Sequence, residues 1–347
     1  MKRFITFFMV VILMFTVTAC GSNSTAPTAP TAPAAPAAEA NTDQSTDEKI
    51  IIRLGFSTEP DSHYGQGSKE FERLVEEYSN GKVDVQLFAS ATLGNERDMI
   101  EGLSLGTLEM CLSSTGPLPN FSKEFQVFDL PFIITDKERA YEVMDGEIGK
   151  EILSSLESIN INALGFWENG FRHISNSKKE IVTPEDMAGI KIRTMENPIH
   201  MATFQLLGAM PTPMAFSELF TALQQGTIDG QENPLVIFDT NKFSEAQKYL
   251  SLTGHVYSPS VMMISKNTFE NYPQDVQDAI IKAEEEARTW ERNFCTKMDE
   301  ELVAKIKASG VTVTEVDKAA WQKACEPIYA QYEAEINPEY IKALTGK

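Results

Sequence analysis

One arginine, Arg193, lies in a position to bind an anion. It ends a short apolar strand and precedes by four residues a helix start, at which Asn197 is the N-cap and Pro198 the first helical position. A guanidinium group and the free N–H groups of a helix N-terminus both attract a carboxylate or a phosphate. The surrounding stretch, residues 189–234, contains neither an acid/base pair nor a nucleophile. We therefore predict a binding site here and not a catalytic one.

Alternating strands and helices would position this arginine. Apolar patterns predict strands at residues 50–56, 83–87, 108–113 and 162–167, with helical spacing at 71–78, 99–103, 136–144 and 147–156. The pattern then repeats with a helical turn capped by Thr183, a strand at 190–194, helices at 197–207 and 217–225, and a strand at 261–265. This order predicts an α/β fold with a largely parallel sheet.

The longest periodic run covers residues 274–309. Its apolar residues recur every three or four positions and are Ile280, Ala283, Ala287, Trp290, Phe294, Met298, Leu302 and Ile306. At about 1.5 Å per residue the run would measure roughly 54 Å, which exceeds one small domain. We expect one helix to span two α/β lobes around a cleft, with lobe I at residues 50–169 and 258–297 and lobe II at 170–257 and 298–347. The acidic residues 284–286 are expected on a solvated face.

The N-terminal residues have the pattern of an export signal. Lys2 and Arg3 precede sixteen mostly apolar residues, and small residues then precede Cys20. Sixteen residues are short for a bilayer span, and the pattern resembles a bacterial lipoprotein signal. We predict a signal peptide at 1–19, lipidation of Cys20 and an Ala/Pro/Thr-rich linker over 20–49. An uncleaved anchor helix with an incidental cysteine is the alternative, and both interpretations export the chain.

Charge and cysteine content narrow the partners. The formal net charge is -20, and removal of Lys2 and Arg3 would make it -22. So acidic a surface repels phosphate backbones, and we predict no nucleic-acid partner. The widely spaced Cys111, Cys295 and Cys325 form no CxxC or His/Cys cluster, so no metal site is expected. Cys111 is expected in the core, and Cys295 and Cys325 are free thiols unless they pair across two helices.

Motifs for catalysis and cofactors are not found. The sequence has no GxSxG, HExxH or Walker pattern, and Gly65-Gln66-Gly67 lacks the third glycine of a dinucleotide loop. We expect no cofactor and no catalytic residue. The four histidines are scattered and are expected to be structural; they are His63, His173, His200 and His255.

Several segments resemble one protein family. They include FERLVEEYSNGKVDVQLFASATLGNERDMIEGLSLGTLEM, FDLPFIITDKERAYEVMDG, EDMAGIKIRT and LGAMPTPMAFSELFTALQQGTIDGQENP. From residue 50 to about 287 the chain is similar to the DctP-type solute-binding proteins of the tripartite ATP-independent periplasmic (TRAP) transporters. The resemblance implies a two-lobed fold like that of periplasmic binding proteins, with a ligand cleft between the lobes.

The resemblance also implies ligand-binding residues. Arg193 would form a bidentate salt bridge with a ligand carboxylate, Asn233 would support it, Phe216 would cover the ligand, and Arg172 would lie at the lobe entrance. Lobe I would contribute the strand-end residues Ser57, Thr58, Glu96 and Ser114. Ligands of open α/β sheets bind at the carboxyl ends of strands, where Trp167 is also expected.

Structural roles remain open for the same side chains. Arg193 could pair with Glu196, and Arg172 could belong to a structural ion pair. Asn233 precedes Pro234 and could form a turn. Trp167 and Phe216 could be core aromatics.

The family match implies a lipid-anchored, monomeric, extracytoplasmic receptor that passes an organic acid to integral membrane TRAP permease subunits. Two arginines would suit a C4-dicarboxylate, whereas the serines, Thr58 and Glu96 would suit the hydroxyls of a sugar acid. Because Glu96 disfavours a second carboxylate, we favour a hydroxylated monoacid such as a uronate or aldonate. A ligand-sensing protein that feeds a signalling receptor is one alternative. An enzyme with its active site in the cleft is another, and the missing nucleophile and base motifs argue against it.

Overall fold

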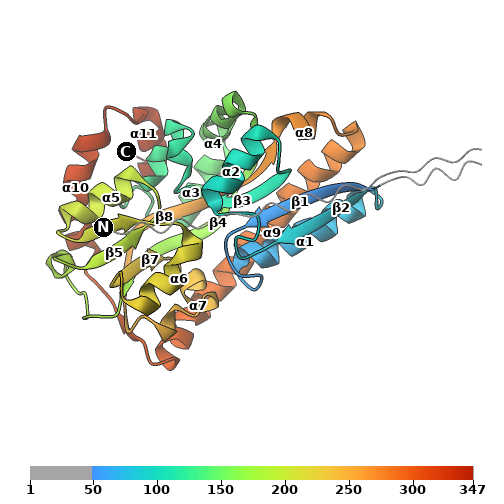
Figure 1. Cartoon of the computed structure of the whole chain (residues 1–347). Coiled ribbons are helices and arrows are strands. Elements are labelled where there is room, and N and C mark those ends of the chain that lie inside the picture. Colours follow the sequence, from blue (N-terminus) through green and yellow to red (C-terminus); the bar gives the residue numbers. More distant parts are fainter. Residues whose placement is uncertain (1–48, 347) are drawn as a thin grey trace, which may run out of the picture. The chain divides into compact units, whose positions relative to one another are not determined.

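Two long strands, β4 (Ile161–Asn176) and β8 (Tyr249–Ser265), pair antiparallel in the middle of one sheet (Figure 1). The computed structural model describes residues 49–346, except for the side chain of Glu300. The strand order is β2-β1-β3-β8-β4-β7-β5-β6, with β9 (Thr312–Thr314) beside β8. The strands predicted at 162–167 and 261–265 are only parts of β4 and β8. β8 is buried almost throughout on both faces, so most of it lacks the alternation from which a strand is predicted.

The first half of the sheet matches the predicted alternation. β1 (Ile50–Phe56) has the predicted bounds and lies between β2 (Val83–Phe88) and β3 (Met110–Ser114). The helices of this half are α1 (His63–Tyr78), α2 (Glu96–Leu105) and α8 (Lys266–Glu270). Asn95 and Asp98 form a capping box at the start of α2, and Gly106 ends the helix in the left-handed conformation at φ 72°. Local capping residues therefore determine where α2 begins and ends.

The second half contains three strands of four residues each. They are β5 (Lys191–Thr194), β6 (Met210–Pro213) and β7 (Gly230–Asn233). Their helices are α5 (Pro198–Leu206), α6 (Phe216–Gln225), α7 (Leu235–Thr240) and α10 (Lys318–Tyr332). The predicted helix start at Asn197 and Pro198 is confirmed. β6 and β7 were not predicted, because one contains two prolines and the other reads GQEN.

Shorter helices surround these two halves. They are η1 (Leu118–Asn120), η2 (Lys123–Asp129), α3 (Lys137–Asp145), α4 (Glu147–Ser154), η3 (Ser155–Ile159), η4 (Pro184–Met187), η5 (Phe243–Glu245) and α11 (Pro338–Thr345).

The prediction of a largely parallel sheet holds only within each half. β1 pairs parallel with β2 and β3, and β5 pairs parallel with β6 and β7. The contacts of β8 with β3 and of β4 with β7 and β8 are antiparallel. The sheet is mixed because the chain crosses between the halves on β4 and returns on β8.

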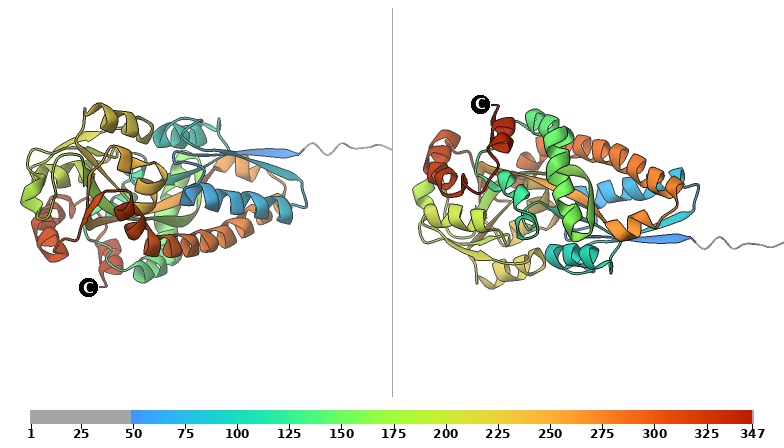
Figure 2. Two further views of the ribbon diagram at one scale, coloured as in Figure 1. Left: turned by 90° about the horizontal axis from the view of Figure 1, so that it is seen from below. Right: turned by 90° about the horizontal axis from the view of Figure 1, so that it is seen from above.

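Helix α9 (Gln274–Ala308) spans both halves, as predicted. Ile280, Ala283 and Ala287 pack into the core of β1 and α1, whereas Leu302 and Ile306 pack into the core of α6 and α7. In Figure 2 it appears in orange to red beside the blue α1. The chain thus has the predicted two-lobed α/β fold.

Two side chains of α9 depart from its amphipathic pattern. Trp290 is 38% exposed and stacks on Phe294, with 5.2 Å between ring centroids. Of the acidic residues 284–286, Glu285 and Glu286 are exposed as expected. Glu284 is instead 1% exposed, and it accepts hydrogen bonds from Trp167 Nε1 at 2.8 Å and Arg288 Nε at 3.0 Å. Position 284 lies four residues after Ile280 and three before Ala287, so it shares their buried face.

The N-terminal predictions lie outside the described residues. These are the signal peptide at 1–19, lipidated Cys20 and the linker at 20–49, of which the structure describes only Lys49. Within residues 49–346, no helix is long and apolar enough to cross a membrane. The predicted lobe boundaries stay a prediction.

Candidate functional site

Side chains from both halves of the sheet enclose one small pocket. It is lined by Ser57, Thr58, Tyr64, Glu96, Ser114, Asn169, Arg172, Arg193, Met195, Phe216, Asn233 and Ile237. Eight of the nine predicted site residues are in this set, and Trp167 is the exception. The volume of about 20 Å³ leaves room for about one water molecule. The structure is therefore closed around this pocket.

The carboxyl ends of strands supply most of the polar lining. Ser57 and Thr58 follow β1, and Ser114 is the last residue of β3. Arg193 is the penultimate residue of β5, and Asn233 is the last residue of β7. Parallel strands present their carboxyl ends at one edge, which is where open α/β sheets bind ligands.

Arg193 is a buried cation with donor capacity to spare. It is 2% exposed, and its Nε and Nη2 donate to the carbonyl oxygen of Met214 at 2.9 and 2.7 Å. Its Nη1 has no hydrogen-bond partner among the described residues. Burial lowers the pKa of Arg193 to about 10, so the group stays charged at neutral pH. The ring of Phe216 lies 6.0 Å from its guanidinium carbon. This arrangement can accept an anion.

The start of α5 does not join Arg193 at the pocket, contrary to the sequence-based expectation. Asn197 accepts hydrogen bonds from the N–H groups of Ile199 and His200 at 2.9 and 3.0 Å. Its amide nitrogen donates to Asp129 Oδ2 at 2.7 Å and to the carbonyl oxygen of Gly116 at 2.8 Å. The cap thus satisfies the helix N-terminus internally, and Asn197 is not among the lining residues.

Arg172 is 1% exposed and therefore does not lie at an entrance. Its Nε and Nη2 contact the two carboxylate oxygens of Glu232 at 2.5 and 2.8 Å, and its Nη2 also contacts Asn233 Oδ1 at 3.1 Å. His255 Nε2 lies 3.3 Å from Glu232 Oε2. Burial would raise the pKa of Glu232, but the Arg172 charge and the hydrogen bonds hold it well below its usual range. These contacts agree with the alternative in which Arg172 belongs to a structural ion pair. The sequence did not identify Glu232 as its partner.

Glu96 brings a carboxylate to the pocket from the first half of the sheet. Its Oε1 accepts the backbone N–H of Ser114 at 2.9 Å, and its Oε2 lies 3.4 Å from the Ser114 hydroxyl. Burial raises the pKa of Glu96 despite these donors and the nearby arginines. The pocket therefore combines one unpaired guanidinium with one carboxylate.

Trp167 is a core residue in this structure. It is fully buried in the cluster that contains Phe56 and Phe71, and its indole nitrogen donates to Glu284. The expectation that it ends a strand is wrong, because β4 continues to Asn176. Its side chain packs in the core of the first half of the sheet and does not line the pocket.

Four lining residues were missed from the sequence, namely Tyr64, Asn169, Met195 and Ile237. Asn169 lies in the part of β4 that was not predicted. Tyr64 is the second residue of α1, whose start is capped by Ser62. No motif distinguishes these residues, so only the tertiary structure identifies them.

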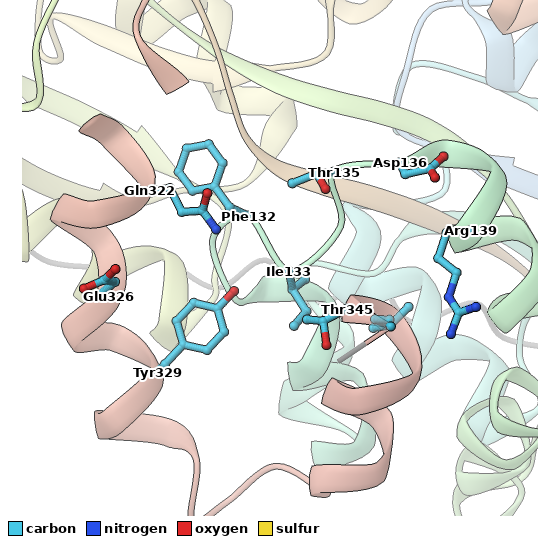
Figure 3. Close-up of a pocket in the computed structure, with 11 residues that line it drawn as sticks. Phe132, Ile133, Thr135, Asp136, Arg139, Gln322, Glu326, Tyr329 and Thr345 are labelled. Atoms are coloured by element: carbon cyan, nitrogen blue, oxygen red, sulfur yellow. The ribbon is translucent and has the colours of Figure 1, made fainter. Parts of the chain in front are cut away.

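A larger cavity of about 620 Å³, drawn in Figure 3, shares no lining residue with this pocket. Gln322, Glu326 and Tyr329 of α10 line it, together with Arg139 of α3. Arg139 donates to the carbonyl oxygen of Ala343 at 2.9 and 2.7 Å, and the Tyr329 hydroxyl donates to the carbonyl oxygen of Pro131 at 2.8 Å. None of its lining residues has a buried polar atom without a partner. We therefore take the smaller pocket as the candidate site.

Metal and thiol chemistry find little support in the described part of the chain. No group of three or more His, Cys, Asp or Glu residues is placed there to hold a metal ion. Cys111, Cys295 and Cys325 are buried free thiols, so Cys295 and Cys325 do not pair. Cys111 lies in the core as predicted.

Known proteins resemble this chain along most of its length. Residues 54–335 match the family described as bacterial extracellular solute-binding protein, family 7 (DctP). A solute-binding protein from Verminephrobacter eiseniae is 45% identical over 297 residues, covering 85% of this chain and 89% of the relative.

Solved structures with the same architecture contain organic acids. A TRAP periplasmic solute-binding protein from Polaromonas, bound to D-erythronate, is 42% identical with a TM-score of 0.83, covering 86% of this chain and 98% of that one. One from Sulfurospirillum deleyianum, with bound succinate, is 37% identical with a TM-score of 0.82, covering 85% and 98%. Both a hydroxylated monoacid and a diacid thus occur in these related proteins.

Proposed function

Because the chain belongs to family 7 of the bacterial extracellular solute-binding proteins, the DctP family, we propose that it is the receptor that captures an organic acid for a TRAP transporter. Members of this family bind solutes for transporters and are not enzymes. The chain is accordingly a solute-binding protein. The identity of the acid, the permease partner and the membrane anchor form the proposal.

The unpaired guanidinium of Arg193 carries the proposal. A ligand carboxylate at Nη1 would supply the acceptor that this buried group lacks. Arginine suits this role because its planar fork matches two carboxylate oxygens. Asn233 would position the site through Arg172, and Phe216 would cover the bound acid.

The charges at the pocket favour a monoacid. Arg172 and Arg193 are the two cationic residues in the lining, and Arg172 is already paired with Glu232. One carboxylate therefore satisfies Arg193, whereas a second finds no free cation and faces Glu96. We propose a sugar acid, an aldonate or uronate, and the relative with bound D-erythronate supports this class. A C4-dicarboxylate is the alternative, supported by the relative with bound succinate.

Transport requires the closed pocket to open. β4, β8 and α9 connect the two halves, so a hinge in these elements would admit the ligand. Bound acid would then favour the closed form, which integral membrane TRAP permease subunits recognise in this proposal. The receptor would act as a monomer outside the cytoplasm, tethered through lipidated Cys20.

Replacement of Arg193 tests the proposed function. Removing one partner of a buried charge pair costs roughly 3–5 kcal/mol, so Arg193→Ala should weaken acid binding by about a hundredfold or more. The ligand is first identified by a thermal-shift screen of aldonates, uronates and dicarboxylates, because ligand that binds only the folded state raises the melting temperature. Isothermal titration calorimetry then measures the affinity.

Arg53→Ala is the matched control. Arg53 pairs with Glu109 at 2.7 Å and is not a lining residue, so its loss should leave affinity unchanged. Wild-type affinity in Arg193→Ala would contradict the proposed role of this arginine.

A further inference from the structure

A β-bulge in β4 places one unassigned amide at the pocket. The pairing of β4 with β8 shifts register between Glu168 and Gly170, and Gly170 has a φ of 121°. A Cβ at Gly170 would lie 3.2 Å from Pro234 Cβ, so the backbone there suits glycine. In a regular strand, Asn169 and Arg172 would face opposite sides of the sheet. The bulge makes Asn169 the extra residue of β4, without a partner in β8, and both Asn169 and Arg172 line the pocket.

The side-chain oxygen of Asn169 is an open acceptor. Asn169 is 2% exposed, and its Nδ2 donates to Ser258 Oγ at 3.3 Å. The His63 imidazole lies near its Oδ1, but no hydrogen bond of ordinary geometry reaches this oxygen within residues 49–346. Leaving a buried acceptor unpaired is unfavourable, so a ligand group that donates to it gains binding free energy.

Tyr64 adds a hydroxyl to the same pocket. It is 1% exposed, and its Oη lies near Ser260 without a hydrogen bond of ordinary geometry. Burial raises the pKa of Tyr64 well above its ordinary value, so the phenol remains neutral and can both donate and accept. Asn169 Oδ1, in contrast, can only accept a hydrogen bond. The same is true of the Glu96 carboxylate when it is ionised.

We propose that Asn169 and Tyr64 recognise hydroxyl groups on an acid whose carboxylate binds Arg193. This rests on the proposed function, because it requires a carboxylate at Arg193. A hydroxyl can donate to Asn169 Oδ1, whereas a second carboxylate is only an acceptor and cannot. Asn169 thus selects a hydroxylated monocarboxylate over a diacid, and both residues select it over an unsubstituted fatty acid. Their location on β4 and α1 makes them specificity residues separate from the carboxylate-binding arginine.

Acids of equal chain length test the proposal. Calorimetric titrations of wild-type protein would compare D-erythronate with butanoate and succinate, and galactonate with hexanoate. We expect the hydroxylated acid of a pair to bind at least about a hundredfold more tightly, because the site is built to hydrogen-bond its hydroxyls. Asn169→Leu, of similar volume, should weaken binding of the hydroxylated acid roughly ten- to a hundredfold and that of the unsubstituted acid by less than about twofold.

Tyr64→Phe provides a second variant that removes only one oxygen atom. Tyr64→Phe should lower the ratio of the affinity for the hydroxylated acid to that for the unsubstituted acid by roughly fivefold. If Asn169→Leu fails to fold, this variant alone tests hydroxyl recognition. Tyr340→Phe is the matched control, because that partly buried hydroxyl donates to Glu151 at 2.9 Å outside the pocket. It should leave the ratio unchanged.

The outcomes separate the two proposals. If Asn169→Leu and Tyr64→Phe leave the ratio unchanged, or weaken both acids of a pair equally, hydroxyl recognition by these residues is overturned. Tighter binding of succinate or butanoate than of the hydroxylated acids would also overturn hydroxyl recognition. The proposed function would still stand if Arg193→Ala lost the binding of succinate or butanoate. If wild-type protein binds no carboxylic acid, the proposed function itself fails.

Discussion

Arg172 and Arg193 are both buried arginines at one pocket, yet their surroundings give them different capacities. Arg172 is held by both oxygens of Glu232, whereas Arg193 rests on a neutral backbone carbonyl and keeps Nη1 unpaired. An arginine with an internal carboxylate partner orients its neighbours. An arginine without one can bind an anion from solution. The distinction depends on the partner and not on the residue type.

Glu96 should make diacid binding depend on pH. Because burial raises the pKa of Glu96, this carboxyl takes up a proton at a higher pH than an ordinary glutamate. The protonated form has no negative charge and can donate to a second carboxylate. We expect the affinity for succinate relative to D-erythronate to rise as pH falls. Calorimetric titration at several pH values measures the ratio of the two affinities.

Glu96→Gln provides the comparison for this pH effect. The neutral amide should bind succinate about tenfold more tightly than wild type at neutral pH. The pH dependence that remains in this variant then belongs to the ligand. An identical pH profile in wild type and variant would rule out the assigned role of Glu96.

At the scale of elements, α9 buries two carboxyl groups against the crossing strand β4. Glu284 pairs with Arg288 and Trp167, but Glu291 receives only the backbone N–H of Glu168 at 3.0 Å and the thiol of Cys295 at 3.1 Å. Burial, with a smaller contribution from the nearby Glu168 carboxylate, raises the pKa of Glu291 to about 8. The folded protein therefore holds a proton on Glu291 at neutral pH.

This proton should make stability decrease with rising pH. A carboxyl whose folded-state pKa is raised contributes fully below its unfolded pKa, and the contribution is lost as pH rises through about 8. Glu291→Gln should remove on the order of 3 kcal/mol of pH dependence between about pH 4.5 and 7. Urea unfolding at several pH values measures the effect.

Glu285→Gln, an exposed change on the same helix, should leave the dependence of the unfolding free energy on pH unaltered. If Glu291→Gln kept the pH dependence of the wild type, another group would carry the proton.

At the scale of the whole molecule, the site exists only where the two halves meet. Ser57, Glu96 and Ser114 come from one half, and Arg193, Phe216 and Asn233 come from the other. Since the closed pocket has room for about one water molecule, ligand entry requires the halves to separate. Binding and closure are therefore coupled in the proposed transport cycle.

Anchoring can be tested with the full chain in a bacterial host. If Cys20 is lipidated, wild-type protein should sediment with membranes, and Cys20→Ser should move most of it to the soluble fraction, because the predicted anchor is lost. Immunoblotting of fractionated cells measures the distribution. Membrane association of Cys20→Ser that resists salt but not detergent would argue for the alternative anchor helix.

The sequence alone determined many local boundaries and the position of the key arginine. Asn197 with Pro198, Gly106 and Gly226 mark helix ends because caps and left-handed turns depend on neighbouring residues. The family resemblance also identified eight residues that line one pocket. These predictions succeeded where local chemistry or a quoted motif carried the information.

Only the tertiary structure decided which of those residues can contact a ligand. It extended β4 beyond Trp167, introduced the bulge that places Asn169 at the pocket, and buried Glu284 against β4. It also paired Arg172 with Glu232, sixty residues further along the chain. Such outcomes depend on hydrogen bonds and desolvation between distant segments, which a local pattern does not contain. The same physics left Nη1 of Arg193 unpaired and thereby produced the candidate site.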